Sequence, residues 1–439
     1  MRFKQSLLGM SVAGALLAMS GNAAASAFAL IEQSSGLGNA FAGGAAGAED
    51  ATTIFFNPAG MSRLRGKQVS LAASAIKPSA KFSNTGSTGA ALQTAGGNGG
   101  DAGSLALVPN TYVVTEIEPA LRFGLGINVP FGLKTDYDPT WIGRFQAITS
   151  KLQTINVNPS LSYQMNDVTS LGIGLNYQHI TGDLTSAVNY SAAAFSAGGA
   201  PLLTAIGGAG KEGVSTMSGS DSAWGYNLGA LFNVTPSTRV GVAYRSKITY
   251  TLKGTISFTN VPTAMAASPT FANGDVNLPV NMPDYFSISG FHQLNDKWDV
   301  MADLSRTGWG TFQQLVITRT NGTVVQNVQE NWKNTWRFAL GATHHYNEQW
   351  LARVGVAYDQ TPVPDAYRTA RIPDNNRTWL AFGGQYKPSS AGTLDFGYAH
   401  LFVKDSTIAN NQTASGAGNL VGTYANSVDI LSVQYAYSF

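Results

Sequence analysis

The sequence predicts an all-β fold: an antiparallel transmembrane β-barrel of fourteen strands with a small N-terminal hatch, or plug, inside its lumen. Three observations predict it. Apolar side chains alternate with small or polar ones over long stretches, and short and long connections alternate along the chain. A nearly uncharged segment rich in glycine and alanine precedes the first strand.

The composition favours a chain that has one apolar and one polar wall. Only 12% of its 439 residues are charged, against about 25% in an ordinary soluble domain. Its mean hydropathy is only -0.02, and no interior run approaches the ~20 apolar residues of a membrane helix. A formal net charge of +2 gives no basic footprint for nucleic acid. The chain has no cysteine, and we expect it to hold neither a metal nor a cofactor.

The first residues carry an export signal. Arg2 and Lys4 precede the apolar run 7–19, and Ala23 to Ala25 supply a small-residue cleavage site. We predict a signal peptide over residues 1–25, removed after Ala25.

The segment 29–61 looks like filler for a cavity that another part of the chain builds. It is almost uncharged, rich in glycine and alanine, and ends on Asn57-Pro58-Ala59 followed by glycine. Alone it could not bury enough apolar surface to offset the entropy cost of its ordering. Its glycines let other backbone approach closely.

Period-two alternation begins near residue 68 and continues to the C-terminus. In 336–343, for example, Trp336, Phe338 and Leu340 alternate with Arg337, Ala339 and Gly341. Alternation of this length predicts β-strands, and apolar side chains outside with small or polar ones inside are typical of a membrane barrel.

The connections supply an independent count of the strands. Six short turns alternate with seven long loops rich in Gly, Ser and Asn, among them 182–220 and 308–330, which gives fourteen strands. An even number of strands puts both termini of the chain on the side of the short turns. The loop 182–220 is predicted to be partly helical. The final strand ends on Phe439, an aromatic residue that resembles the signal for the outer-membrane assembly machinery.

One predicted strand contains a proline. Residues 122–132 alternate well until Val129-Pro130. Proline cannot donate to a β-ladder, and a closed barrel has no edge strand to accommodate it. Pro130 therefore either ends this strand or kinks it.

Several motifs together resemble the FadL family of outer-membrane transporters of long-chain fatty acids and hydrophobic compounds. The most specific is SSGLGNAFAGGAAGAEDATTIFFNPAGM (34–61), and the likeness extends over essentially the whole mature chain. The others are WGYNLGALF (224–232), YRSKI (244–248), FQQL (312–315), PVPDAYRTARIPDNNRTWL (362–380) and the aromatic C-terminus.

The resemblance implies a hatch over residues 26–67, a barrel over residues 68–439 and a route for a ligand. It favours the kink at Pro130, with an opening in the wall at Val129, Pro130, Phe131 and Gly132. Asn57, Pro58 and Ala59 would lie in the hatch beside this opening. Ligand would settle first in an outer groove, move to an inner pocket and leave sideways into the membrane.

The residues expected along this route have alternative roles. Trp141, Ile142 and Phe145 are expected to line the outer groove, although an aromatic girdle facing lipid explains them too. Phe28 is expected to occupy or border the inner pocket. A second set concerns the head group: Lys333 and Arg337 are candidate cations for a carboxylate, and a structural charge in the lumen is the competing interpretation.

The expected function is passive uptake through the outer membrane of a Gram-negative bacterium, by a monomer in contact with outer-membrane lipid and lipopolysaccharide. The cargo is either a long-chain fatty acid or a neutral aromatic or aliphatic hydrocarbon, which needs no cation. An outer-membrane lipid hydrolase is disfavoured because none of the five histidines lies in a nucleophile motif. A general porin would gain nothing from a plug of this composition.

Overall fold

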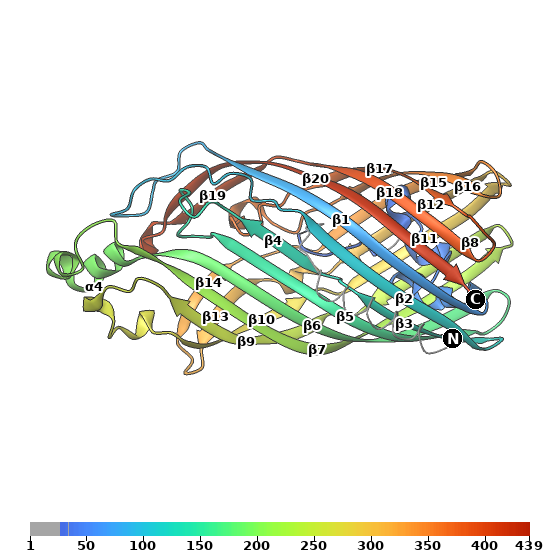
Figure 1. The fold of residues 1–439 in the computed structure, drawn as a ribbon, viewed down its shortest axis with the longest axis horizontal. Helices are drawn as coiled ribbons and strands as arrows, with labels where there is room; N and C mark the ends of the chain where they lie inside the picture. The colour runs from blue at the N-terminus through green and yellow to red at the C-terminus, as the bar shows by residue number, and fades with distance from the viewer. Residues whose placement is uncertain (1–26, 34) are drawn as a thin grey trace, which may run out of the picture.

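The structure is a computed structural model that describes residues 27–33 and 35–439, so the predicted signal peptide and Ser26 lie outside the described residues. The strands of this described part form one closed antiparallel sheet of fourteen spans, as predicted (Figure 1). Eight spans are single strands: β1 (Lys67–Asn84), β2 (Ala106–Glu118), β5 (Thr149–Gln164), β6 (Thr169–Asn189), β7 (Glu212–Thr235), β16 (Trp350–Asp359), β17 (Arg377–Tyr386) and β20 (Gly418–Ser438).

The other spans are interrupted, and each carries two strand labels. They are β3 (Leu121–Asn128) with β4 (Gly132–Asp136), β8 (Thr238–Arg245) with β9 (Ile248–Phe258), β10 (Gly274–Met282) with β11 (Tyr285–Asn295), β12 (Trp298–Thr307) with β13 (Gln314–Arg319), β14 (Val324–Gln329) with β15 (Thr335–His345), and β18 (Gly392–Val403) with β19 (Ser406–Gln412).

The first and last strands close the barrel. β1 pairs with β20 along its length, from Gln68 opposite Ser438 to Asn84 opposite Gly422. Side chains on β20 alternate between lipid and lumen as the sequence predicts: Leu431 is 56% exposed, whereas Ser432 is 2% exposed. Closure between β1 and β20 leaves neither terminal strand with an unpaired edge in hydrocarbon.

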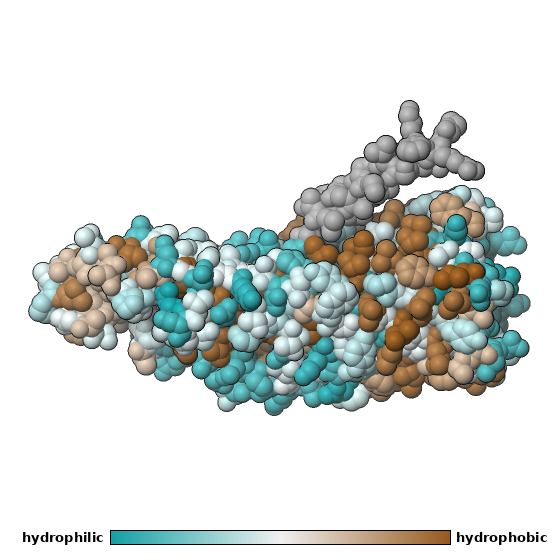
Figure 2. Space-filling model, turned by 90° about the horizontal axis from the view of Figure 1, so that it is seen from below, coloured by the Kyte–Doolittle hydropathy of each residue, from teal (hydrophilic) through white to brown (hydrophobic). Residues whose placement is uncertain are grey.

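The apolar outer face covers only part of the barrel. Figure 2 shows apolar side chains gathered on the half of the molecule where Figure 1 places the C-terminus, with a mostly hydrophilic surface over the other half. The barrel therefore extends well beyond the membrane on the side of the long connections. Among the described residues, no helix is both long and apolar enough to cross a membrane.

Because the barrel extends beyond the membrane, two segments that were predicted to be loops contain strands. Within 182–220, β6 continues to Asn189 and β7 begins at Glu212. Within 308–330, β13 and β14 form a hairpin with a turn at 320–323. Period-two alternation of apolar and polar residues did not predict these strand ends, because their outer faces meet water and need no apolar side chains. The helical part of the first loop is confirmed as α4 (Tyr190–Ala205), at the outer tip of β6 and β7 (Figure 1).

Short helical turns fill the lumen. The stretch from Ala27 to Leu64 contributes many of the fully buried residues. It contains η1 (Ser35–Asn39), α2 (Gly44–Gly47), α3 (Thr53–Phe56) and η2 (Pro58–Arg63). The remaining short 3-10 turns are η3 (Thr263–Met265), η4 (Pro269–Phe271), η5 (Trp309–Thr311), η6 (Asp365–Tyr367) and η7 (Thr413–Ser415). A plug inside the lumen agrees with the predicted fold.

Candidate functional site

The third span of the barrel is kinked. β3 ends with Asn128 opposite Asn156 of β5, and β4 resumes with Gly132 opposite Gln153. From residue 128 to residue 132 the kinked span advances four residues, while β5 advances only three, from 156 to 153. The extra residue makes a β-bulge. The span continues after Pro130, so of the two alternatives for this proline the kink is correct.

The kink leaves one side of the wall without a ladder. β2 pairs with β3 only as far as Thr111 opposite Ile127, and residues 106–110 of β2 pair with β1 alone. The wall between β2 and β4 therefore lacks ladder hydrogen bonds over residues 106–110. This is the place where the sequence predicts an opening.

The N-terminal segment (residues 27–33) pairs with the kink from inside the barrel. The backbone N–H of Leu30 donates to the carbonyl oxygen of Pro130 at 2.8 Å, and the N–H of Gly132 donates to that of Phe28 at 2.9 Å. Buried backbone groups need partners, and these bonds supply them where the barrel ladder is broken. The hatch and the wall are thus joined through main-chain hydrogen bonds.

Side chains reinforce this junction. Gln33 donates from Nε2 to the carbonyl oxygen of Val129 at 2.9 Å, and Asn110 of β2 donates from Nδ2 to the carbonyl oxygen of Glu32 at 3.1 Å. The N-terminal segment therefore contacts both sides of the interrupted wall.

Phe28 is held in an aromatic cage. Its ring centroid lies 4.6 Å from that of Trp309, 5.6 Å from Trp332, 6.0 Å from Phe312 and 6.2 Å from Phe131. Most of these pairs are edge-to-face, a favourable geometry for aromatic rings. The cage anchors the start of the N-terminal segment while that segment is docked on the kink.

The N-terminal segment lines two largely apolar cavities. Phe28 lines the first, the inner cavity, of about 70 Å³, together with Leu133, Leu152, Leu252, Leu278 and Phe312. Residues 29–31 line the second, the hatch cavity, of about 80 Å³, together with Pro58, Pro130 and Phe131. A dry engineered cavity that binds benzene measures about 150 Å³, so neither cavity by itself is large enough for a long acyl chain. Phe28 borders the inner cavity, and its contact with a ligand stays a prediction.

Asn57, Pro58 and Ala59 fasten the hatch to the wall. Asn57 accepts the N–H of Ala59 through Oδ1 and donates from Nδ2 to the carbonyl oxygens of Ala45 (2.8 Å) and Ala230 (2.9 Å). Since Ala230 belongs to β7, one side chain joins hatch and barrel. Pro58 shares the hatch cavity with the kink, which brings two parts of the predicted gate together.

The hatch approaches the wall too closely to admit side chains there. A Cβ added at Gly229 would lie 1.9 Å from Asn57 Oδ1, and one at Gly172 would lie 2.3 Å from the nitrogen of Ala59. Both glycines lie on neighbouring strands, β7 and β6. The expectation that glycine permits close backbone approach applies to the wall as well as to the hatch.

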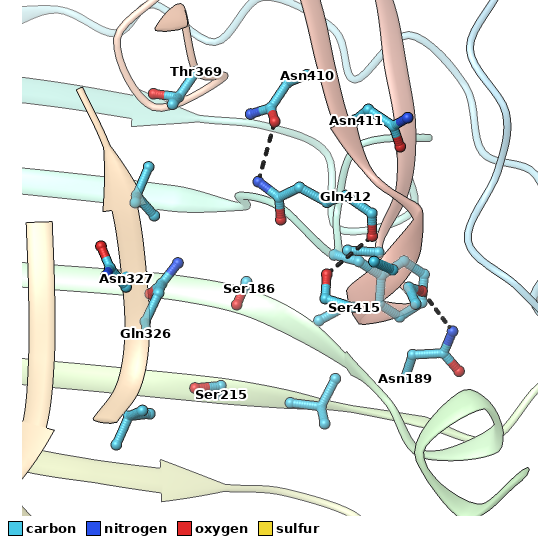
Figure 3. Close-up of a pocket in the computed structure, with 18 of the residues that line it drawn as sticks. Ser186, Asn189, Ser215, Gln326, Asn327, Thr369, Asn410, Asn411, Gln412 and Ser415 are labelled. Atoms are coloured by element: carbon cyan, nitrogen blue, oxygen red, sulfur yellow. Dashed lines mark hydrogen bonds between the residues drawn. The ribbon is translucent and has the colours of Figure 1, made fainter. Parts of the chain in front are cut away.

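The predicted outer-groove residues are divided between two environments. Phe145 lines the outer cavity, a space of about 920 Å³ at the mouth of the barrel (Figure 3). Trp141 does not: it is 0% exposed, stacks at 4.1 Å on Tyr137 and donates from Nε1 to the carbonyl oxygen of Ala147. Ile142 packs in the same small core. Their role is therefore structural, and a lipid-facing girdle is equally wrong for Trp141.

Neither predicted cation faces the inner cavity. Lys333 is exposed and outside the lining of the inner and hatch cavities. Arg337 is buried and lines the hatch cavity, with one guanidinium nitrogen donating to the carbonyl oxygen of Ala40. The prediction that Lys333 lies near the pocket is wrong. The segment before β15 turns outward at this residue, and alternation within the strand cannot indicate such a turn. Nε and Nη1 of Arg337 have no hydrogen-bond partner among the described residues, and the choice between a head-group cation and a structural charge paired to an acid stays a prediction.

Sequence reasoning missed the charged residues that do line the inner cavity: Lys151, Glu330 and Arg371. Arg371 donates to the carbonyl oxygen of Thr149 (3.2 Å) and Oγ of Ser150 (2.9 Å), and it forms no ion pair with Glu330 among the described residues. Burial raises the pKa of Glu330 to about 8, although Trp332 donates to it and Arg371 attracts its charged form. The cavity lining thus holds Lys151 and Arg371 beside a buried carboxyl group whose neutral form is favoured.

Known proteins resemble this chain over most of its length. A family model described as outer membrane protein transport protein (OMPP1/FadL/TodX) matches residues 16–439. The long-chain fatty acid transport protein of Shigella flexneri is 30% identical over 386 residues, covering 84% of this chain and 85% of its own. Outer membrane protein P1 of Haemophilus influenzae is 32% identical over 465 residues, covering 97% and 99%.

Solved structures agree with the fold. A Pseudomonas aeruginosa FadL homologue superposes with a TM-score of 0.84 at 26% identity, covering 96% of this chain and 100% of its own. The Pseudomonas putida toluene transporter TodX gives a TM-score of 0.66 at 19% identity, covering 89% and 94%. At that identity the second likeness concerns the fold alone.

Proposed function

Because the chain belongs to the OMPP1/FadL/TodX family of outer-membrane transport proteins, we propose that it takes up long-chain fatty acids or related hydrophobic compounds by a lateral route. The chain is a β-barrel of the Gram-negative outer membrane, as predicted. Its relatives are named as transport proteins, in agreement with the expectation that it is not an enzyme.

One observation supports the lateral route most strongly. The same short segment, residues 27–33, lines both the inner cavity and the hatch cavity and pairs with the kinked wall. Displacing this segment would join the two cavities and release the main-chain bonds at the wall in a single movement. Binding of a ligand and opening of the wall are then coupled without an energy source, because ligand shifts the population of the displaced state.

The physical advantage of the route lies in keeping the ligand out of water. Burying each CH₂ group contributes about 0.8 kcal/mol, so an apolar inner cavity can strip a long chain from water. Exit between β2 and β4 delivers that chain directly into hydrocarbon. An axial exit would instead require passage across the polar contacts of the hatch.

For a carboxylate cargo, Arg371 replaces Lys333 as the head-group cation. Arg371 is buried on the lining of the inner cavity, and its two hydrogen bonds to neutral oxygens leave its charge unneutralised. Charge-assisted bonds from a guanidinium to a carboxylate are about twice as strong as neutral ones. A neutral hydrocarbon would use the apolar lining alone.

Equilibrium binding distinguishes the two cargo classes. Arg371→Gln should weaken binding of a long-chain fatty acid at least tenfold and leave toluene binding unchanged, whereas Lys333→Gln should affect neither. Preference for toluene with no effect of Arg371→Gln would move the function to hydrocarbon uptake. Binding of neither compound would contradict the proposed function.

Uptake by variants tests the route itself. Deleting Asn57 to Ala59, or introducing Gly132→Trp at the wall, should abolish uptake of labelled fatty acid while the barrel still assembles. Folding is checked by resistance of the purified barrel to detergent denaturation. Normal uptake by both folded variants would contradict lateral exit.

The expected partners extend the proposal. The hydrophilic half of the barrel would contact lipopolysaccharide, and the exposed aromatic Phe439 would be read by the assembly machinery. We also propose a monomer, because a closed sheet satisfies its own backbone.

A further inference from the structure

The outer cavity differs in chemistry from the cavities below it. It is far larger, at about 920 Å³, and two of its walls carry amide side chains (Figure 3). β14 contributes Gln326, Asn327 and Gln329 to one wall, and β19 contributes Asn410, Asn411 and Gln412 to the other. Seryl side chains from β6 and β7 lie between the two walls (Figure 3). An apolar cargo needs none of these groups.

The lining offers almost no charge. Arg368 is its only charged residue among those that the structure describes, and its side chain is fully buried. The guanidinium bonds the carboxylate of Asp365 at 2.7 Å, the carbonyl oxygen of Asp374 at 3.0 Å and that of Thr407 at 2.7 Å. Its Nη2 has no hydrogen-bond partner among the described residues, but its charge is already paired with Asp365.

The amides retain hydrogen-bonding capacity. Gln326 makes no side-chain hydrogen bond with any described residue. Asn410 points into the cavity and acts only as an acceptor, from Gln412, so its NH₂ group remains available. Asn327 and Asn411 lie on the opposite faces of their strands and point away from the cavity (Figure 3). Each amide offers two donors and an acceptor, which matches a hydroxyl group that both donates and accepts.

Aromatic and apolar side chains complete the cavity. Phe145, Phe258 and Phe271 belong to the same lining, where the apolar C–H face of a sugar ring could pack. Met217 lines both the outer and the inner cavity, so the two spaces are neighbours. A molecule with a hydroxyl-rich head and an apolar tail would meet suitable chemistry at both ends.

We propose that the outer cavity recognises amphiphiles whose head group is uncharged and rich in hydroxyls, as in an alkyl glycoside. The head lies between the amides of β14 and β19, and the tail points past Met217 toward the inner cavity. This inference rests on the proposed route and adds a selection step at its entrance. Recognition by paired donors and acceptors discriminates strongly against analogues that lack the hydroxyls.

The test uses ligands with matched tails. Protein in lipid nanodiscs is titrated calorimetrically with octyl glucoside, octanol and octanoate below their micellar concentrations, with empty nanodiscs as the blank. Octyl glucoside should bind at least tenfold more tightly than octanol. Gln326→Leu and Asn410→Leu should each weaken the glucoside at least fivefold and leave octanol within twofold. Asn277→Leu, on β10 outside the lining, should change neither ligand.

Three outcomes would overturn the inference. Equal binding of glucoside and octanol, or full glucoside binding by the leucine variants, would show that the amides do not recognise hydroxyls. Displacement of octyl glucoside by oligosaccharide freed from lipopolysaccharide would assign the cavity to sugars of the surrounding membrane. Octanoate distinguishes failure of the outer-cavity proposal from failure of the proposed function. Octanoate binding persists if only the selection step at the entrance is wrong, and it is lost if the uptake route itself is wrong.

Discussion

At the scale of single residues, Glu32 is a source of pH dependence within the hatch. Its side chain is fully buried, and neither carboxylate oxygen has a hydrogen-bond partner among the described residues. Desolvation raises the pKa of Glu32 to about 7, although Arg337 and Arg377 favour the charged form and Asp359 opposes it. The docked hatch therefore binds the proton of Glu32 more tightly than the undocked chain does.

The sign of the effect on stability follows from this shift. As pH rises from 4.5, the undocked chain releases the proton first, so docking weakens progressively until about pH 7, with a total cost of about 3 kcal/mol. Hydrogen exchange of residues 27–33, corrected for intrinsic rates, should be slower at pH 5 than at pH 8. Glu32→Gln should remove this difference. Glu49, an exposed residue of the hatch, supplies the control: Glu49→Gln should keep the difference in exchange between pH 5 and pH 8. Persistence of that difference in Glu32→Gln would contradict the assignment of the pH dependence to Glu32.

At the scale of elements, the hatch is held by backbone proximity to β6 and β7. A valine at Gly229 would overlap Asn57, whose amide joins the hatch to the carbonyl oxygen of Ala230. We expect Gly229→Val to weaken docking by about 2 kcal/mol, a typical cost of overpacking, while the barrel stays folded. Limited proteolysis near residues 57–61 should be at least tenfold faster in this variant.

Gly290→Val is the matched control for this prediction. Gly290 lies on β11, another strand of the barrel, and an added Cβ there meets nothing within 4 Å. Its proteolysis should equal that of the unchanged protein. Equal rates in both variants would mean that the contact at Gly229 does not hold the hatch.

The same scale shows what sequence alone could predict. Alternation and turn spacing predicted the fourteen strands, because a closed sheet between lipid and lumen imposes period two on every strand. Pro130 marked the irregular point of its strand because proline cannot donate to a ladder, and the family resemblance favoured a kink over a strand end there. Trp141, Lys333 and Arg371 lie outside regular strands, and their orientation depends on loop packing between distant segments. Arg371 enters the inner cavity from the connection after β16, which no local pattern indicates.

At the scale of the whole molecule, the proposed transport requires a single movement of the N-terminal segment that both joins the cavities in the lumen and opens the wall. Ala29 lies opposite Phe131, and main-chain hydrogen bonds flank the pair on both sides. This pattern makes them a non-hydrogen-bonded pair of an antiparallel ladder, in which Cα atoms lie about 4.5 Å apart. A disulfide bridges Cα atoms about 4.4–6.8 Å apart, so Ala29→Cys with Phe131→Cys should cross-link the N-terminal segment to the wall. The chain has no cysteine of its own to compete.

Locking this junction should stop transport reversibly. The oxidised double variant should take up labelled fatty acid at least tenfold more slowly than the same protein after reduction, with cross-linking checked by mass spectrometry. A second pair, Ser74→Cys with Ser432→Cys, joins lumen-facing residues of β1 and β20 whose hydroxyls already lie 3.1 Å apart. It should have no effect on uptake, because β1 and β20 stay paired in the proposed cycle. Full uptake by the cross-linked Ala29–Phe131 variant would mean that ligand leaves without separating the hatch from the kinked wall.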